Sequence, residues 1–397
     1  MARTRKAAII GAGQTRYGDF PELSIKELFT AAYREAVTSV DSGLDPSRIQ
    51  AAYVGTLGTG GFQLGQPAPL LMGHVGLPSV PAVRVENACA SGGFALHAAA
   101  TAISAGLYDV ILVAGVEKMR DVSAAKSRYW LGVSGDTEYE RLAGLTFAGI
   151  YALLANRYLH EYRLDRTLLS MVAVKNHRHG AGNPKAQFRK EINLDDALRA
   201  PMVAEPLNVY DCCPTSDGAA VVILAAADVA REFTDSPVYI AGFGAASDYL
   251  AIHDRACHTS LRATVNAARS AYEMAGMKPV DIHLAEVHDC FTIAEVLAYE
   301  DLGFCGRGGA AYLLENADTS LGGRIPVNVS GGLKSKGHPL GATGVGQAYE
   351  VFHQLRGEAQ MPARQVKGAT TALTHNVGGS GGTATVFIYS VEGGVRL

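Results

Sequence analysis

Short apolar runs alternate with helix-type segments over most of the chain, and this alternation limits the fold more than any other feature of its 397 residues. Residues 110–115, VILVAG, are apolar without a break, which is typical of a strand covered on both faces. Ser24 and Glu27 have the spacing of a capping box, and apolar residues follow them at helical spacing. Strands and helices that alternate in this way predict an α/β fold.

The alternation is interrupted once, by charged helices and proline-punctuated stretches. We therefore expect a first β/α half at residues 1–120 and a second at 231–397. Between them, residues 121–230 form a mainly helical insertion that ends with the last strand of the first half. The expected strands are residues 7–11, 51–55, 83–85, 110–115, 219–224, 238–243, 284–288, 325–329, 370–374 and 383–389.

Composition excludes several classes of protein. The chain is 48% hydrophobic and 18% charged with a formal net charge of −3, so it is neither globally disordered nor a basic binder of nucleic acid or anionic membranes. No apolar stretch reaches the length of a membrane span. The six cysteines form no C-x-x-C pair and are too sparse for a disulfide scaffold, so we expect no zinc site and free thiols in a reducing compartment. These features favour a cytoplasmic enzyme.

Cys89 follows a predicted strand and precedes an alanine-rich helix. A thiol at a helix N-terminus lies near unpaired backbone N–H groups and the positive end of the helix dipole, and both favour the nucleophilic thiolate. A buried structural cysteine is the alternative, and it is the commoner role of this residue type. The local sequence leaves both open.

Two further segments contain candidate catalytic groups. In GHPLGATG, residues 337–344, three glycines and a proline fix a turn that can present His338 to a cavity, although a loop histidine is also often solvated or caps a helix. His288, Asp289 and Cys290 follow an apolar strand, and ligands of open α/β sheets bind beyond the carboxyl ends of strands. The alternative is that Asp289 merely caps the next helix.

A glycine-rich segment, THNVGGSGG at residues 374–382, has the backbone freedom to point N–H groups at an anion, as an oxyanion hole requires. A plain glycine-rich hairpin is the alternative. Residues 11–16 begin like a dinucleotide-binding fingerprint, but Arg16 stands where the third glycine belongs. We interpret the adjacent Cys212 and Cys213 as packing residues, because a disulfide between neighbours would be strained.

Four segments taken together resemble the thiolase superfamily, and within it the sterol-carrier-protein-type and archaeal acetoacetyl-CoA thiolases. They are VENACASG at 85–92, DCCPTSDGAA at 211–220, HDCF at 288–291, and NVSGG at 328–332 running into GHPLG at 337–341. The resemblance spans essentially the whole chain in order. It implies the thiolase fold, with two similar β/α halves that each carry a mixed five-stranded sheet, stacked in five α/β/α/β/α layers. Residues 121–230 would be the loop domain that covers the active site and helps hold CoA.

The resemblance also implies roles for single residues. Cys89 matches the nucleophile that is acylated, and His338 matches the histidine that activates this thiol and helps bind the thioester oxygen of the second substrate. His288 stands where better-known thiolases have asparagine, and it would hold a water in the same oxyanion hole. Gly378 matches the glycine whose N–H, with that of Cys89, polarises the acyl-enzyme carbonyl. No residue that binds the rest of the substrate can be named.

The sequence departs from the better-known thiolases at one position. Their Cys-x-Gly motif carries the thiol that moves the substrate proton, and here the matching triplet is Asn376-Val377-Gly378. The sterol-carrier-type pattern implies that Cys290 supplies this thiol from another loop. Without such a base, formation of the carbon–carbon bond should fail.

The implied activity is that of an acetyl-CoA C-acetyltransferase, in which two acetyl-CoA give acetoacetyl-CoA and CoA, or the reverse thiolysis of a longer 3-ketoacyl-CoA. No metal or cofactor is implied, since CoA thioesters are the substrates. The family is typically dimeric or tetrameric. Archaeal relatives assemble with hydroxymethylglutaryl-CoA synthase and a small zinc-containing OB-fold protein, which would place the chain in the mevalonate pathway.

Three other functions remain as alternatives. One is a thiolase-fold aldolase or lyase that acts on CoA esters with a small OB-fold partner. Such relatives often lose the nucleophile, whereas Cys89, His288, Cys290 and His338 are all present here. A scaffold role in a larger complex is compatible with the favoured activity. A cysteine hydrolase is disfavoured by the tandem β/α layout.

Overall fold

The computed structural model describes residues 5–61 and 63–392 of the chain. Its strands form one nine-stranded sheet in the order β3-β2-β4-β7-β1-β8-β11-β10-β9, and a separate two-stranded sheet, β5-β6. The nine strands are β1 (Ala7–Gln14), β2 (Ala51–Gly55), β3 (Ala82–Val85), β4 (Val110–Glu117), β7 (Gly218–Ala226), β8 (Val238–Ser247), β9 (Leu284–Glu286), β10 (Thr371–Gly378) and β11 (Thr383–Ser390).

The large sheet consists of two parts that meet only at β1 and β8. Their antiparallel contact involves two residue pairs, Ala8 with Tyr239 and Ile9 with Val238. In the first part β2 runs parallel to β3 and β4, whereas β7 is antiparallel to β4 and β1. In the second part β9 and β10 are parallel and β11 is antiparallel to both β10 and β8. Both parts are therefore mixed, as expected.

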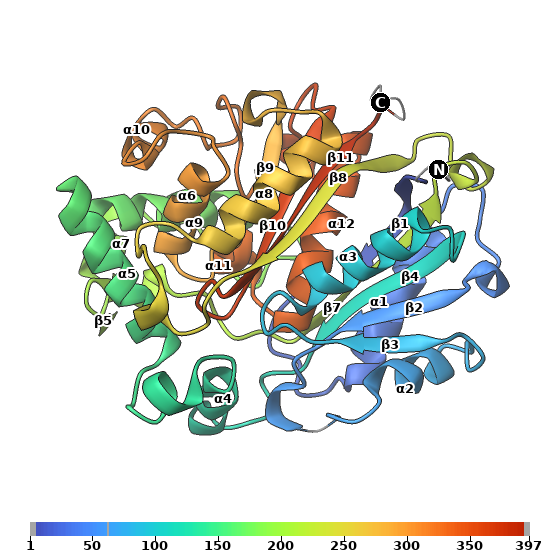
Figure 1. Ribbon diagram of the computed structural model, residues 1–397, viewed down its shortest axis with the longest axis horizontal. Coiled ribbons are helices and arrows are strands. Elements are labelled where there is room, and N and C mark those ends of the chain that lie inside the picture. The colour runs from blue at the N-terminus through green and yellow to red at the C-terminus, as the bar shows by residue number, and fades with distance from the viewer. Residues whose placement is uncertain (1–4, 62, 393–397) are drawn as a thin grey trace.

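The layers alternate between helices and sheet (Figure 1). Helices α1 (Ile25–Thr38) and α2 (Pro67–His74) pack on the outer face of the first part of the sheet. Helices α8 (Arg262–Ala275) and α9 (Thr292–Asp301) lie outside the second part. Between the two parts lie α3 (Ser91–Ser104) and α12 (Thr343–Arg356), which are in contact with each other and with strands of both parts. This is the predicted five-layer arrangement.

The helix starts follow from local chemistry where the sequence predicted them. The Glu27 N–H donates to Ser24 Oγ at 3.3 Å, and the Ser24 N–H donates to Glu27 Oε2 at 2.7 Å, so the capping box before α1 is confirmed. One predicted strand is absent as such. Residues 325–329 contribute only a single parallel bridge, from Val327 to Ala285, so the second part of the sheet has four strands and not five.

The interruption between the two halves is mainly helical. It contains α4 (Ala124–Gly132), α5 (Phe147–Tyr162), α6 (Thr167–Ala181) and α7 (Leu194–Arg199), followed by the hairpin of β5 (Met202–Ala204) and β6 (Leu207–Asn208). Short helices α10 (Ala310–Glu315) and α11 (Gly332–Lys336) precede α12. Figure 1 shows this helical region beside the carboxyl-terminal half, over the ends of the central strands.

Candidate active site

The candidate residues from three distant segments meet at one place. Cys89 lies between β3 and α3, His288 and Cys290 follow β9, and His338 follows α11. One ligand-type atom each of Cys89, His288 and His338 lies within 4.8 Å of the others. The structure therefore brings together a thiol and two imidazoles that are separated by up to 249 residues in sequence, counted from 89 to 338.

The chain turns sharply just before Cys89. Ala88 is buried and has a φ of +49°, a backbone conformation that costs energy for a residue other than glycine. Ser91 stabilises the turn, because its hydroxyl accepts the Asn87 N–H at 2.9 Å and donates to the Ala88 carbonyl at 2.6 Å. A Cβ on Gly92 would lie 2.5 Å from the Gly341 carbonyl oxygen, so glycine is needed for the close approach of α3 to the His338 loop.

The Cys89 thiol is neutral at physiological pH. Burial raises its pKa to about 12, and the neighbouring Cys213 and Glu117 side chains act in the same direction. Hydrogen bonds from the backbone of Gly379 and from its own N–H lower the pKa by less. The effect of the helix N-terminus is therefore too small to make Cys89 a thiolate at rest, and the thiol needs a base to become a nucleophile.

His338 has the geometry of that base. Its Nδ1 lies 2.7 Å from Thr343 Oγ1, and the single hydroxyl proton of Thr343 is donated to the Pro339 carbonyl at 3.0 Å. The hydroxyl must then accept from Nδ1, so Nδ1 carries the ring proton and Nε2 has a free lone pair. This buried Nε2 has no protein partner among the described residues. Burial lowers the pKa of His338 to about 3, which keeps the ring neutral.

Glu117, at the end of β4, holds the His338 loop in place. Its buried carboxylate accepts the backbone N–H groups of Gly341 at 3.0 Å and of Thr59 at 2.8 Å. It also accepts the N–H groups of Leu57 and Gly58 at 3.0 and 2.9 Å. The sequence analysis did not single out this residue, since a single glutamate at a strand end has many ordinary explanations.

His288 is fully buried and lies edge-on to His338, with ring centroids 5.1 Å apart and an interplanar angle of 81°. Its Nδ1 is 3.0 Å from Asn376 Nδ2, and its Nε2 has no partner among the described residues. Burial lowers the pKa of His288 well below its usual range, and the neighbouring His338 and His375 act in the same direction. Both imidazoles of the site are therefore neutral.

Cys290 is buried beside Tyr151, a residue of α5 that the sequence analysis did not single out. The two side chains are hydrogen-bonded, and the Tyr151 hydroxyl donates its single proton to the Gly379 carbonyl at 3.1 Å. Burial raises the pKa of the Cys290 thiol well above 9.0, and a negative charge on Cys89 would raise it further. Cys290 therefore rests as a thiol close to Cys89. The aromatic ring of Phe291 stacks on Tyr151 with centroids 4.7 Å apart.

Asp289 lies between His288 and Cys290 in sequence, and its carboxylate belongs to a separate buried polar network. Its carboxylate accepts the Leu333 N–H at 2.6 Å and Asn176 Nδ2 at 2.7 Å. The same Asn176 amide donates to Glu295, which pairs with Lys175 at 2.5 Å. Asp289 thus ties the loop after β9 to α6 and α11. The alternative that it caps the next helix is wrong, because the N-cap residue of α9 is Phe291 and Asp289 binds the N-terminus of α11 instead.

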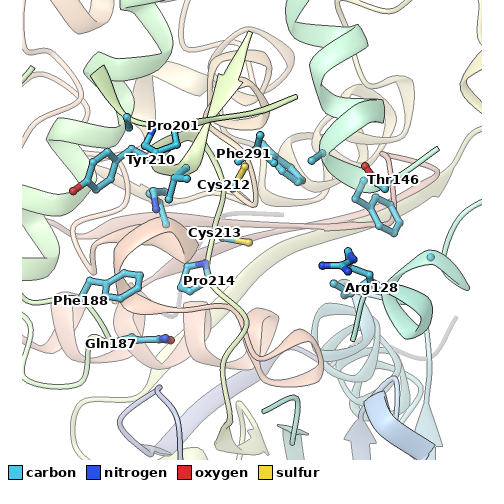
Figure 2. A pocket seen from close by; sticks show the side chains of 18 of the residues that line it. Arg128, Thr146, Gln187, Phe188, Pro201, Tyr210, Cys212, Cys213, Pro214 and Phe291 are labelled. Carbon is cyan, nitrogen blue, oxygen red and sulfur yellow. The ribbon is translucent and has the colours of Figure 1, made fainter. Parts of the chain in front are cut away.

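A large cavity of about 1320 Å³ lies beside these residues, and its lining includes Phe291, which directly follows Cys290. Figure 2 shows Cys212, Cys213 and Phe291 on one side of it and Arg128 across from them. The Cys213 N–H donates to the Cys290 carbonyl at 3.0 Å, so both adjacent cysteines line the cavity next to the site as well as packing against the core. Both are free thiols. The charged residues that line the cavity are all cations: Arg128, Arg141, Arg189, Lys190 and Lys334.

Two family models match the chain. "Thiolase, N-terminal domain" covers residues 7–228, and "Thiolase C-terminal domain-like" covers residues 244–391. The chain belongs to the thiolase family. It is 46% identical over 387 residues to the acetyl-CoA acetyltransferase of Methanothermobacter thermautotrophicus, a match that covers 97% of this chain and 100% of the relative. The resemblance inferred from the four motifs is confirmed.

Solved structures of low sequence identity share the thiolase fold. A chain of the Ltp2-ChsH2(DUF35) aldolase superposes with a TM-score of 0.86 at 24% identity, covering 100% of both chains. Human mitochondrial 3-ketoacyl-CoA thiolase superposes with a TM-score of 0.75 at 18% identity, covering 98% of this chain and 100% of that one. Within residues 5–61 and 63–392, no helix is long and apolar enough to cross a membrane.

Proposed function

We propose that the chain is an acyl-CoA acyltransferase, an acetyl-CoA C-acetyltransferase that condenses two acetyl-CoA to acetoacetyl-CoA and CoA and catalyses the reverse thiolysis. The observation that carries the proposal is the meeting of the Cys89 thiol with two neutral imidazoles. A cavity lined by cations lies next to them, with Phe291 in its wall. The curated relative that is 46% identical has this activity in its name.

In the first half-reaction Cys89 takes the acetyl group. Its proton passes to His338 Nε2, whose lone pair is free, as the sulfur attacks the thioester carbonyl. The carbon–sulfur bond to CoA breaks, and the leaving thiolate takes the proton of Cys290. The developing oxyanion is held by the backbone N–H groups of Cys89 and Gly378.

In the second half-reaction the Cys290 thiolate removes a proton from the methyl group of a second acetyl-CoA. The enolate carbon attacks the acetyl carbon on Cys89, the bond to sulfur breaks, and the Cys89 thiolate recovers its proton from His338. The thioester oxygen of the second acetyl-CoA is held by His338 and by His288, which acts directly or through a water. Two thiols in different surroundings thus divide the nucleophile and base roles.

The cavity supports CoA as the carrier of both acyl groups. CoA is polyanionic through its phosphates, and its pantetheine arm is long and weakly polar. Five cations and an apolar wall that includes Phe188, Tyr210 and Phe291 suit both parts. The reaction as balanced above uses only protein groups and the two thioesters, so the proposal includes no cofactor.

Substitution of the two thiols tests the division of roles. Incubation with acetyl-CoA should add one acetyl group to the wild type and to Cys290→Ala, and none to Cys89→Ser, as measured by intact mass. Condensation and thiolysis should be lost in both variants. Cys257→Ala, which removes an exposed thiol, is the matched control and should leave both measurements unchanged. Catalysis retained by Cys89→Ser would refute the proposal, and condensation by Cys290→Ala would place the base elsewhere.

Self-association is the second part of the proposal. Strand β3 lies at one end of the large sheet, and no strand within residues 5–61 and 63–392 pairs with its outer edge; Val83 on it is 52% exposed. Such an edge is suited to pairing with another copy. We propose a homodimer or homotetramer in the cytoplasm that can assemble with hydroxymethylglutaryl-CoA synthase and a small zinc-containing OB-fold protein. Native mass measurement of the protein from its host tests both points, and a monomer alone would contradict them.

The aldolase alternative has one observation in its favour, the superposition on the Ltp2-ChsH2(DUF35) aldolase. At 24% identity this likeness shows the fold alone. The two activities separate in a direct assay of acetoacetyl-CoA thiolysis by the purified chain without any partner. Activity there supports the acyltransferase, and activity only on a β-hydroxyacyl-CoA with a partner would support the aldolase.

A further inference from the structure

Asn376 lies between the nucleophile and His288 but takes no part in either half-reaction. It is buried in β10, and its side chain makes three hydrogen bonds. Its Oδ1 accepts the Gly93 N–H at 3.1 Å, and its Nδ2 reaches the Cys89 carbonyl and His288 Nδ1, each at 3.0 Å. The bond from Gly93 fixes which end of the amide is oxygen.

These bonds determine where His288 carries its proton. The amide group has two N–H protons, and one is donated to the Cys89 carbonyl, which cannot donate. The other points at His288 Nδ1, which must therefore be the unprotonated, accepting nitrogen. In a neutral ring the proton is then on Nε2, the atom that faces the site without a protein partner.

We propose that Asn376 is a positioning residue that fixes His288 as an Nε2–H donor and thereby keeps the site a proton-transfer site and not a metal site. The two imidazoles then have opposite tautomers: His338 offers a lone pair at Nε2, and His288 offers a proton. The pair can accept the thiol proton and stabilise an oxyanion at the same time. The catalytic part of this proposal rests on the proposed function.

The part of the proposal that concerns metal binding rests on geometry alone. One thiol and two imidazoles with atoms within 4.8 Å of one another are a donor set that Zn²⁺ binds, and tetrahedral bonds would need separations of roughly 3.3–3.8 Å. Binding through His288 Nε2 would move its proton to Nδ1. Nδ1–H would then face the N–H of Asn376, two donors 3.0 Å apart with no acceptor between them. Asn376 therefore opposes the binding of a metal ion through His288 Nε2.

The tautomer can be measured without any activity. Proton-coupled ¹⁵N spectra of histidine-labelled protein, assigned with His288→Gln, should show the His288 proton on Nε2 in the wild type. In Asn376→Asp a carboxylate oxygen would face Nδ1, and the proton should move there. A wild-type His288 protonated on Nδ1 would overturn the proposal even if the protein is a fully active thiolase.

Titration with Co²⁺ and Zn²⁺ gives the second readout. Affinity should rise in the order wild type, Asn376→Ala, Asn376→Asp, with a gain of roughly 10- to 100-fold for Asp, the range for groups that orient a metal-bound histidine. A thiolate–Co²⁺ absorption band should appear in Asn376→Asp and vanish when Cys89→Ser is added. Equal affinity in all three proteins would overturn the proposal, and Asn376→Ala keeps the test open if the Asp variant does not fold.

Asn183→Asp is the matched control. Asn183 is equally buried and donates to the backbone carbonyl of Ser330 at 2.7 Å, but it contacts no imidazole of the site. It should change neither the His288 tautomer nor metal affinity. In chelated buffer, Asn376→Asp should lower kcat for condensation by roughly 10²–10³, the cost of one oxyanion donor, while the control should not. Loss of this kinetic effect alone would refute only the catalytic part.

Discussion

Replacing Thr343 with valine should slow acylation of Cys89 while leaving the shape of the site intact. The Thr343 hydroxyl accepts the His338 Nδ1–H at 2.7 Å and donates to the Pro339 carbonyl at 3.0 Å. As His338 takes the thiol proton it becomes a cation, and this hydrogen bond becomes charge-assisted. Bonds to charged groups are worth about 1.5–3 kcal/mol against about 0.5–1.5 kcal/mol for neutral ones, a difference of about 1–1.5 kcal/mol.

That difference is lost in Thr343→Val, which corresponds to a fall of roughly five- to tenfold in the acylation rate. The buried Nδ1–H is also left without an acceptor, which should lower the free energy of unfolding by about 1–3 kcal/mol. Acylation is measured by rapid quenching with acetyl-CoA and intact mass, and stability by urea unfolding.

Two controls distinguish this reasoning from a general effect of the substitution. Thr343→Ser keeps the hydroxyl and should acylate at nearly the wild-type rate. Thr385→Val removes a buried hydroxyl for which the described residues offer no partner, so it should not lower stability. An unchanged acylation rate in Thr343→Val, or an equal loss in Thr343→Ser, would refute the role assigned to this hydrogen bond.

Two further predictions follow from the surroundings of Cys89. Because burial raises the pKa of Cys89 to about 12 and lowers that of His338 to about 3, alkylation of Cys89 by iodoacetamide should speed up about tenfold per pH unit from pH 7 to 10. A plateau below pH 8 would instead show a thiolate–imidazolium pair. The second prediction concerns Glu117→Gln, which turns an amide N–H group toward backbone N–H donors. The loss of one or two hydrogen bonds should lower the free energy of unfolding by about 2–4 kcal/mol, and it should also reduce kcat. A melting temperature equal to the wild type would contradict this.

The sequence predicted the elements that have strong local patterns. The apolar strand at 110–115 is contained in β4, and the helix after Cys89 begins at Ser91. The prediction of a strand at 325–329 was wrong, because an apolar run does not by itself provide a partner strand to pair with. Its backbone binds the loop at 319 and the end of β9, with one bridge at Val327. Strand pairing is a tertiary property that periodicity does not contain.

The candidate site divides in the same way. Cys89, His288, Cys290 and His338 could be named because their motifs are contiguous in sequence. Glu117, Tyr151 and Thr343 could not be named, since their roles depend on contacts that only the fold creates. Asn376 was noticed only as the place of a missing cysteine. Its three partners come from α3, from the turn before it and from the loop after β9, so the fold alone reveals its role.

The protonation state of Cys89 shows why magnitudes have to decide between opposing local effects. The helix N-terminus favours a thiolate, but a helix dipole is worth about 0.3–1 kcal/mol for a nearby charge. Burial raises the pKa of Cys89 from 9.0 to about 12, which corresponds to about 4 kcal/mol against the charged form. Burial therefore prevails, and a free thiolate is not available for attack. The thiol can react only as its proton leaves for His338, so nucleophilic attack and proton transfer to His338 are coupled. This explains why the lone pair on His338 Nε2, and the Thr343 hydroxyl that keeps it there, matter more to the reaction than the position of Cys89 at the start of α3.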